Sequence, residues 1–270
     1  MSESIRFYKT ALAGIDAMSA TTSRAFPRHT HDQYGVGVID MGGHVSLSGR
    51  GQVEAGAGSL IFVNPGEVHD GRAVGGKSRS WRMLYLEPTA MVTARADVLD
   101  GVQTAPTFAA PVFADERLRR VFDAAFDGTT REGEDRHAMV AETATLQLVA
   151  VLGVNLSSKL RKTSESTVSI RRVRDKIDAD PAAPLTLTNL AGEAGTSRYQ
   201  LLRAFARELG LTPHAYILQQ RLALARRLIR AGSKLVDAAA TAGFCDQSHL
   251  TRTFARQFGV SPARYRSRTV

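Results

Sequence analysis

The last third of the chain contains one internal repeat, and this repeat limits the folds that the sequence can adopt. The stretch LLRAFARELGLTPHAY begins at Leu201 and the similar stretch LTRTFARQFGVSPARY begins at Leu250, so equivalent residues lie 49 positions apart. In this register Gly210 corresponds to Gly259. Two copies are too few for a solenoid, in which several stacked repeats close a continuous core. We therefore predict a duplicated small unit, each copy made of a helix, a tight turn and a second helix.

Capping residues predict where these helices begin and end. Thr186 and Ser197 suit the N-cap positions of the two helices in the first copy, and Asp246 suits the second helix of the second copy. Between the copies, Thr212 is predicted to cap a longer helix that begins at Pro213 and stops at Gly232, with proline in its first turn and glycine just after its last. This helix would hold the two copies at a set separation.

The net charge of the chain is confined to the repeated segment. Residues 165–270 contain 17 Lys and Arg against 8 Asp and Glu, whereas residues 1–164 contain 18 against 18. The whole excess of +9 therefore lies in the last part of the chain. Charge alone would fit a solvated basic surface equally well. Together with two helix-turn-helix units, it favours double-stranded DNA as the partner, because binding to phosphates releases condensed counterions.

Cysteine and hydropathy patterns indicate the compartment. Cys245 is the only cysteine, so the chain has no internal disulfide, and no stretch near its beginning is typical of a secretory leader. No run approaches the roughly 20 apolar residues that a membrane helix needs. We therefore expect a cytoplasmic protein with no membrane partner.

Residues 21–88 consist of short extended runs separated by glycine and other turn residues. The runs are YGVGVIDMGG, HVSLSGRG, GSLIFVNPGEVHDG and SWRMLYLEP. Runs of this length and spacing are typical of an antiparallel barrel or sandwich rather than of βαβ units. Residues 1–20 carry no clear pattern, and residues 91–99 could form a short helix.

Three histidines stand out in this segment. His29 and His31 lie two positions apart, so alternation along a strand would place both on one face, and His69 follows in NPGEVH. Three imidazoles could form an open metal site, and their layout is similar to the two motifs of the cupin superfamily. Tyr34 and Gly35 stand where the carboxylate of metal-binding cupins is expected. The pattern therefore favours an effector pocket or buried histidines over a metal, and no cofactor is predicted.

Between residues 111 and 160 the apolar period becomes helical. DERLRRVFDAAFDG and HAMVAETATLQLVAVLGVNL each have an apolar stripe, as expected of helices that pack on the outside of the barrel. A stripe left uncovered could pair with a second copy of the protein, although packing within one chain explains the stripes equally well. LSSKLRKTSESTV has no periodicity, which divides the chain into a domain at 1–160, a linker at 161–167 and a domain at 168–270.

On these features, residues 168–267 resemble the DNA-binding domain of the AraC/XylS family of bacterial transcription regulators. The stretch AAATAGFCDQSHLTRTFARQFGVSPARYR is close to the signature of that family, and residues 25–88 resemble its cupin-like sensory domain. The resemblance implies a two-domain α+β protein, with a cupin-like antiparallel β-barrel and packed helices followed by an all-α domain with two helix-turn-helix units and a linker helix. It implies a sequence-specific regulator that reads two half-sites in successive major grooves, about 34 Å apart. Promoter DNA, a small-molecule effector, RNA polymerase and a second copy of the chain are the partners it suggests.

The resemblance also assigns residues to the DNA interface. Arginine suits guanine, glutamine suits adenine, and a methyl group suits thymine, although Leu202 stands where a polar side chain is expected. Arg207 and Arg256, one turn further along, are expected to contact phosphates. The residues expected on the two recognition helices are Ser197, Arg198, Tyr199, Leu202 and Arg203 in the first copy, and Gln247, Ser248, His249, Thr251 and Arg252 in the second.

An effector is expected in the mouth of the barrel, because inward polar side chains in such a cavity need partners. Arg82 and Tyr85 have opposite parity, so they cannot both point inward on a regular strand. The candidate residues are His29, His31, Tyr34, His69, Arg82 and Tyr85.

The sequence leaves two other interpretations open. One is a metal-dependent cupin enzyme or metal sensor with a DNA-binding tail, and the other is a DNA-binding protein whose barrel only dimerises. The sequence has no Ser/His/Asp, Cys/His or phosphate-loop arrangement at a recognisable spacing, so an enzyme is not predicted. The effector, the target promoter and the choice between activation and repression are not encoded in any of these patterns.

Overall fold

The computed structural model describes residues 3–10, 12–48, 51–98, 105–130, 135–155 and 168–269, which fall into two compact units. One unit holds the strands with helices α1–α3, and the other holds helices α4–α10. The predicted linker at 161–167 lies outside the described residues. The sequence therefore predicted the fold class correctly, as a β-rich domain followed by a helical one.

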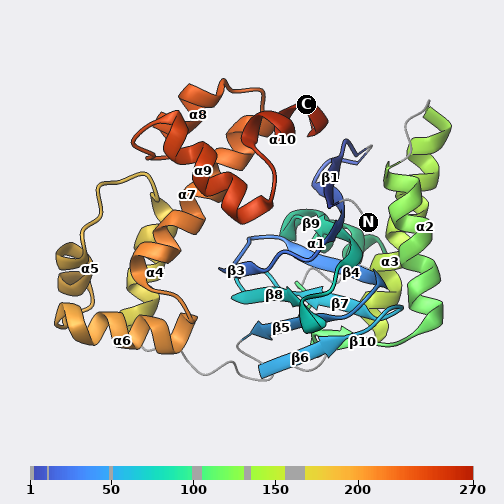
Figure 1. Cartoon of the computed structure of the whole chain (residues 1–270), viewed down its shortest axis with the longest axis horizontal. Coiled ribbons are helices and arrows are strands. Elements are labelled where there is room, and N and C mark those ends of the chain that lie inside the picture. The colour runs from blue at the N-terminus through green and yellow to red at the C-terminus, as the bar shows by residue number, and fades with distance from the viewer. Residues whose placement is uncertain are drawn as a thin grey trace. The chain divides into compact units, whose positions relative to one another are not determined.

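The N-terminal unit is built on two antiparallel sheets (Figure 1). The six-stranded sheet has the order β1 (Ser4–Tyr8), β2 (Ile15–Thr22), β9 (Arg79–Leu86), β4 (Tyr34–Met41), β7 (Leu60–Val63) and β10 (Val112–Phe113). The four-stranded sheet has the order β3 (Phe26–His29), β8 (His69–Ala73), β5 (His44–Ser48) and β6 (Gly51–Ala55), and a short 3-10 turn, η1 (Val74–Gly76), precedes β9. The sequence pattern missed β1 and the first part of β2, which lie in the segment without a clear pattern.

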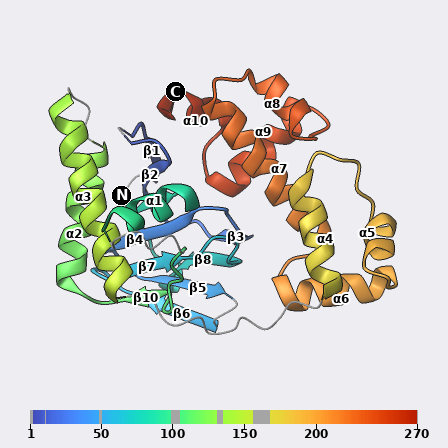
Figure 2. The same ribbon diagram turned by 180° about the vertical axis from the view of Figure 1, so that it is seen from behind.

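Strand register decides which side chains meet the helices. β2, β9 and β4 place Ala17, Leu84 and Val36 side by side on one face of the six-stranded sheet, and all three are buried. This face packs against α1 (Pro88–Val98), α2 (Glu116–Thr130) and α3 (Asp135–Asn155) in one hydrophobic core. Figure 2 shows α2 and α3 running side by side along the sheet. The prediction that helices cover the outside of the β-structure is confirmed.

The opposite face of the same sheet looks toward the four-stranded sheet and is filled by long side chains. Met83 lies in register with Gly37 on β4 and with Met18 on β2. A Cβ atom at Gly37 would overlap the sulfur of Met83, so glycine at this position allows the methionine to fill the space between the sheets. The six-stranded sheet is therefore buried on both faces.

The C-terminal unit is all-helical. Figure 1 shows α7 between the α5–α6 pair and the α8–α9 pair. Its helices are α4 (Val168–Ala179), α5 (Leu187–Glu193), α6 (Arg198–Leu209), α7 (Pro213–Arg230), α8 (Leu235–Thr241), α9 (Gln247–Phe258) and α10 (Pro262–Thr269). Leu201 and Phe205 on α6 are fully buried, as are their equivalents Leu250 and Phe254 on α9. The sequence repeat is therefore a repeat in packing as well.

The helix ends follow the predicted capping residues. The side chains of Thr186, Ser197, Thr212 and Asp246 each accept a hydrogen bond from the backbone N–H three residues later. Each bond satisfies one of the N–H groups that a helix start leaves unpaired. Gly232 has a φ of +87° just beyond the end of α7, as predicted for a glycine that ends a helix.

Candidate functional site

The outward face of α6 carries most of the predicted residues of the first helix-turn-helix unit. Ser197, Arg198 and Arg203 are exposed, and Tyr199 is exposed to 67%. The guanidinium of Arg203 lies 5.7 Å from the centroid of the Tyr199 ring, a cation–π contact that favours one orientation of the arginine. Leu202 is half-buried, so it offers less surface to a partner than its neighbours do.

The corresponding face of α9 is also polar and open. Gln247, Ser248 and Arg252 are exposed, and Thr251 is half-buried. The backbone N–H of His249 donates to the Asp246 cap at 2.6 Å. The predicted base-reading side chains of α9 therefore begin immediately after its capped end.

Two of the predicted side chains have partners inside the unit. The ring of His249 packs edge-to-face on Phe244, with the ring centroids 5.2 Å apart. Arg207 lies 3.7 Å from the carboxylate of Glu208, and both Arg207 and Arg256 are exposed. The Arg207 side chain is 75% exposed, so its guanidinium stays open to solvent beside this contact.

Arg221 on α7 ties the two helix-turn-helix units together. Its Nη1 donates to the carbonyl oxygen of Gly243 at 2.6 Å, in the turn between α8 and α9. Its Nε donates to the carbonyl of Pro181 at 2.7 Å and its Nη2 to that of Ala183 at 3.1 Å, both in the segment leading to α5. One planar side chain thus holds the segment before the first unit and the turn of the second on one helix.

In the N-terminal unit, three of the predicted effector residues lie together. The ring of His31 is 5.2 Å from the ring of His69 and 5.2 Å from the ring of Tyr85, edge-to-face in both pairs. The Nδ1 atoms of His31 and His69 donate to the backbone carbonyls of Gln33 and Glu67. Burial lowers the pKa of His69 to about 4, so this imidazole is neutral at neutral pH.

Tyr34 does not join this group, and its prediction as a side chain in the barrel mouth is wrong. Tyr34 is the first residue of β4 and faces the helices, where it is buried against Phe108 in the hydrophobic core. Its hydroxyl donates to the carbonyl of Pro106 at 2.8 Å. It lies on the same face as Val36, because the two residues are two positions apart on one strand.

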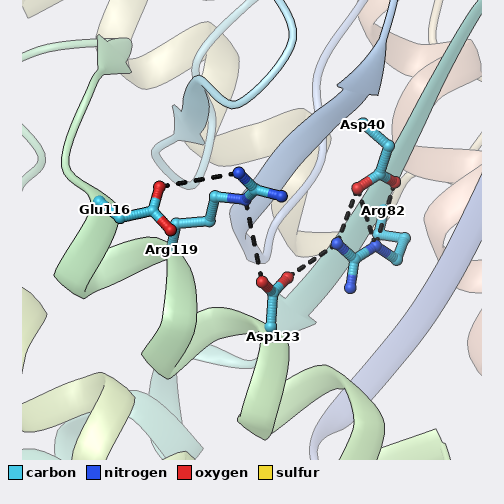
Figure 3. Close-up of polar contacts among 5 residues, drawn as sticks. All are labelled: Asp40, Arg82, Glu116, Arg119 and Asp123. Carbon is cyan, nitrogen blue, oxygen red and sulfur yellow. Dashed lines mark hydrogen bonds and ion pairs between the residues drawn. The ribbon is translucent and has the colours of Figure 1, made fainter.

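Arg82 also faces the helices, so its predicted place in the barrel mouth is wrong (Figure 3). Its Nη2 lies 2.7 Å from carboxylate oxygens of both Asp40 and Asp123, and Asp123 is shared with Arg119. Burial alone would lower the pKa of Arg82, but the two carboxylates outweigh it and raise the pKa. Arg82 therefore joins β9 and β4 to α2.

His29 and His31 are not neighbours on one strand, which corrects the predicted alternation. β3 ends at His29, and His31 lies beyond it in the turn to β4. Among the residues that the structure describes, no group of three or more His, Cys, Asp or Glu side chains is arranged to hold a metal ion.

The N-terminal unit also has an open cleft of about 440 Å³ beside α3. None of the six effector candidates lines it. Its wall includes the Leu12–Ile15 segment, Ala90 on α1, and Thr145 and Leu146 on α3.

Comparison with known proteins decides the family. A family model described as the AraC-like ligand binding domain matches residues 11–148, which is more than half of the chain. A second, described as a helix-turn-helix domain, matches residues 190–268. The chain belongs to the AraC/XylS family of transcription regulators. It therefore combines a DNA-binding unit with a ligand-binding unit.

Curated relatives cover nearly the whole chain. YbfI of Bacillus subtilis (strain 168), an uncharacterized HTH-type transcriptional regulator, is 28% identical over 227 residues, which is 83% of this chain and 81% of that protein. The HTH-type transcriptional activator RhaS of Klebsiella pneumoniae (strain 342) is 25% identical over 261 residues, covering 95% and 93%. The crystal structure of unsaturated fatty acid-bound ToxT from Vibrio cholerae strain SCE256 is 14% identical, covers 100% of this chain and 96% of that one, and has a TM-score of 0.60. The fold of this family member is thus shared by a distant structure.

Of the side chains that share the inner face of β9, the sequence pattern indicated only Tyr85. Arg79, Trp81, Met83 and Tyr85 alternate along the strand and point toward the four-stranded sheet, where Arg79 donates to His44 on β5. Counting back in steps of two from Tyr85 would have found Arg79. In the C-terminal unit, no local pattern marked Arg221.

None of the helices in the residue ranges given above is long and apolar enough to cross a bilayer.

Proposed function

We propose that this family member binds promoter DNA by placing α6 and α9 in successive major grooves, and that a small molecule bound to the N-terminal unit changes this binding. The proposal of DNA binding rests on the similar geometry of the two helix-turn-helix units. Both recognition helices begin at a side-chain cap, and Arg221 holds the turn of the second unit and the approach to the first on one helix. Such a fixed pair suits two half-sites about one helical turn apart.

Arg203 and Arg252 are the proposed base readers. They occupy equivalent positions in the repeat and both are exposed, as direct contact with guanine O6 and N7 requires. Arg207 and Arg256 are proposed to hold the phosphates on either side of these contacts. The remaining residues of the proposed DNA interface are Ser197, Arg198, Tyr199, Leu202, Gln247, Ser248, His249 and Thr251.

His31, His69 and Tyr85 are the proposed contacts of the effector. Their rings meet between the sheets of the unit that matches the AraC-like ligand binding domain. His29, at the end of β3, stays a candidate by its place in the sequence. The ToxT structure with a bound unsaturated fatty acid supports a small-molecule effector for this fold.

A regulator without enzymatic activity is the form of the proposal that the relatives support, since they are described as transcriptional regulators. A cytoplasmic location and RNA polymerase as a partner follow from promoter binding. A second copy of the chain is a further proposed partner, supported by Met139 on α3, which is exposed to 67%.

A metal assay of the purified protein addresses the alternative of a metal-dependent enzyme or metal sensor. Stoichiometric iron, nickel or zinc that is lost in His31→Ala would favour that alternative.

The direct test is to let the purified full chain select fragments from a genomic library and to sequence what it retains. We expect a motif of two half-sites about one turn apart, bound with an affinity that falls steeply with salt. Each neutralised phosphate adds about 0.9 to the slope of log affinity against log salt. The double variant Arg203→Ala/Arg252→Ala is the control, and it should lose much of the preference for the selected site over random DNA. Retention of random fragments by the wild type would contradict the proposal.

The effector part has its own test. Metabolites that change binding to the selected site are identified by fluorescence anisotropy, and the screen is repeated with His31→Ala and His69→Ala. Loss of the response in both variants, with operator binding retained, is the expected result. Equal responses in the wild type and both variants would indicate that the ligand binds elsewhere, such as in the cleft beside α3.

A further inference from the structure

Arg79 is a cation buried between the two sheets of the N-terminal unit. It is the first residue of β9, and its side chain is 0% exposed. Its Nε donates to Nδ1 of His44 at 3.0 Å, and its Nη1 donates to the carbonyl of Arg24 at 3.2 Å. The guanidinium carbon lies 4.7 Å from the centroid of the Trp81 ring.

None of these partners carries a negative charge. Burial lowers the pKa of Arg79 to about 10, which leaves the side chain charged at neutral pH. Within the described part of the chain, no Asp or Glu pairs with this guanidinium, in contrast to Arg82 three residues later, which meets two carboxylates. A buried charge without a counter-ion is strongly unfavourable. The buried guanidinium of Arg79 therefore calls for an anion that the described side chains do not supply.

Arg79 and His44 each have a side-chain nitrogen near the same glycine of β8, Gly71. Nη2 of Arg79 is buried and has no hydrogen-bond partner. Since Nδ1 of His44 accepts from Arg79, the proton of this imidazole lies on Nε2, which is then a second donor. A Cβ atom at Gly71 would lie 2.9 Å from Cε1 and 3.5 Å from Nε2 of His44, and 3.7 Å from Nη2 of Arg79. Both nitrogens thus lie beside the same residue of β8, and that residue has no side chain.

We propose that the N-terminal unit binds a small organic carboxylate whose charge is met by Arg79 and His44. A carboxylate has two oxygens that can accept from two donors at once, and it supplies the charge that the guanidinium lacks. The neighbouring rings of Trp81 and Phe26, 5.9 Å apart, favour a ligand with an apolar or aromatic body over an inorganic anion. The inference rests on the effector response proposed above and gives that effector a chemical class.

The test is thermal unfolding of the full chain with carboxylate probes. Sodium acetate, benzoate and phenylacetate are compared with sodium chloride and sodium phosphate at equal ionic strength, and benzamide serves as the neutral counterpart of benzoate. We expect benzoate or phenylacetate to raise the melting temperature, with a rise that grows with the logarithm of concentration. Benzamide should give no rise. Stabilisation by chloride or phosphate as large as by any carboxylate, or no stabilisation by any carboxylate, would overturn the proposal.

Variants separate ligand binding from a structural role of the arginine. Arg79→Met removes the charge but keeps an apolar chain of similar length, and Arg79→Lys keeps the charge. We expect the carboxylate shift to vanish in Arg79→Met and to persist in reduced size in Arg79→Lys. Without ligand, Arg79→Met should melt no lower than the wild type, because it no longer buries an uncompensated charge. A lower melting temperature together with an unchanged carboxylate shift would make Arg79 a structural residue only.

Arg72→Met is the matched control, because Arg72 is exposed on β8 and its loss changes the net charge equally. It should keep the full carboxylate shift. Operator binding then distinguishes this inference from the proposed function. A carboxylate that binds through Arg79 without changing operator affinity would leave the anion site standing and contradict the effector response. If a metabolite without a carboxylate changes operator affinity, and Arg79→Met does not alter this response, the effector response stands and the carboxylate site is contradicted.

Discussion

Nη1 of Arg221 lies 2.6 Å from the carbonyl oxygen of Gly243, so α7 is joined to the turn that precedes α9. The same guanidinium reaches the backbone before α5 through Pro181 and Ala183. A helix of 18 residues could separate two units without fixing their orientation. The three charge-assisted hydrogen bonds of Arg221 supply that orientation.

Replacing Arg221 by alanine should therefore weaken both the fold and the discrimination of half-site spacing. We expect a loss of about 2 to 4 kcal/mol in the free energy of unfolding, because three backbone carbonyls lose a charged donor. In binding assays on sites whose half-site spacing is changed by one base pair at a time, the variant should show a flatter dependence on spacing than the wild type. Arg221→Lys keeps the charge but not the planar guanidinium. Its free energy of unfolding and its dependence on spacing should lie between those of the wild type and Arg221→Ala.

The control for this experiment is Arg172→Ala, which removes one exposed charge from α4 in the same unit. It should lower affinity for all spacings alike. If Arg221→Ala keeps the spacing preference of the wild type, its hydrogen bonds stabilise the unit without setting its geometry.

Gly243 and Gly192 should respond in opposite ways to alanine. Gly243 has a φ of +77°, and a Cβ atom there would lie 2.9 Å from Cα of Ala182. Gly192 lies in α5, has an ordinary helical backbone and has no atom within 4 Å of an added Cβ. We expect Gly243→Ala to lower the free energy of unfolding by at least about 1 kcal/mol and Gly192→Ala to raise it by up to about 1 kcal/mol. Urea unfolding followed by far-UV circular dichroism measures both, and a stabilised Gly243→Ala would contradict the conformation of this turn.

Local signals explain why the helical unit was predictable and the inner face of the β-unit was not. A cap such as Asp246 acts on the N–H of His249, three residues away, so the sequence alone reveals it. β4 is buried along both faces from Tyr34 to Ile39, one against the helices and one against the other sheet. Alternation between two buried faces cannot say which one lines the interior, and this is why Tyr34 was assigned to the wrong side.

Long-range contacts account for the rest of what sequence reasoning missed. Arg79 meets His44 across 35 positions, and Arg221 meets Pro181 across 40. Neither sequence separation corresponds to a helical or strand period. A short window of the sequence therefore cannot reveal either contact. For Arg82 the polar side chain suggested a contact with a ligand. Its partners in the structure are Asp40 and Asp123, which lie on other elements of the same unit.

Arg203 and Arg252 should contribute to specificity independently. Each is exposed on the outward face of its own recognition helix, and their positions are equivalent in the repeat. Arg203→Ala and Arg252→Ala should each lose about 1 to 3 kcal/mol on the selected site and little on random DNA. Because the two arginines are proposed to touch separate half-sites, the double variant should lose the sum within about 0.5 kcal/mol. Anisotropy titrations at one fixed salt concentration measure these losses, and equal losses on both DNAs would reassign the arginines to phosphates.

The stability of the N-terminal unit should fall as the pH drops from about 6.5 to about 4. Burial lowers the pKa of His44 and of His69 to about 4 in each case, and the positive charge of Arg79 adds to the effect on His44. In the unfolded chain a histidine has a pKa of about 6.5. Between these values the unfolded state binds protons that the folded state does not, so the contribution of each histidine is present above about pH 6.5 and is lost toward pH 4. Each can account for up to about 3 kcal/mol.

Urea unfolding at several pH values, followed by the fluorescence of Trp81, measures this dependence in the right unit, because Trp81 on β9 is the single tryptophan of the chain. His69→Gln removes one of the two titrating groups and should flatten the decline by about half. The control is His214→Gln, which removes an exposed imidazole from α7 and should leave the curve unchanged. A His69→Gln curve that runs parallel to that of the wild type would mean that this imidazole takes up its proton as readily in the folded unit as in the unfolded chain.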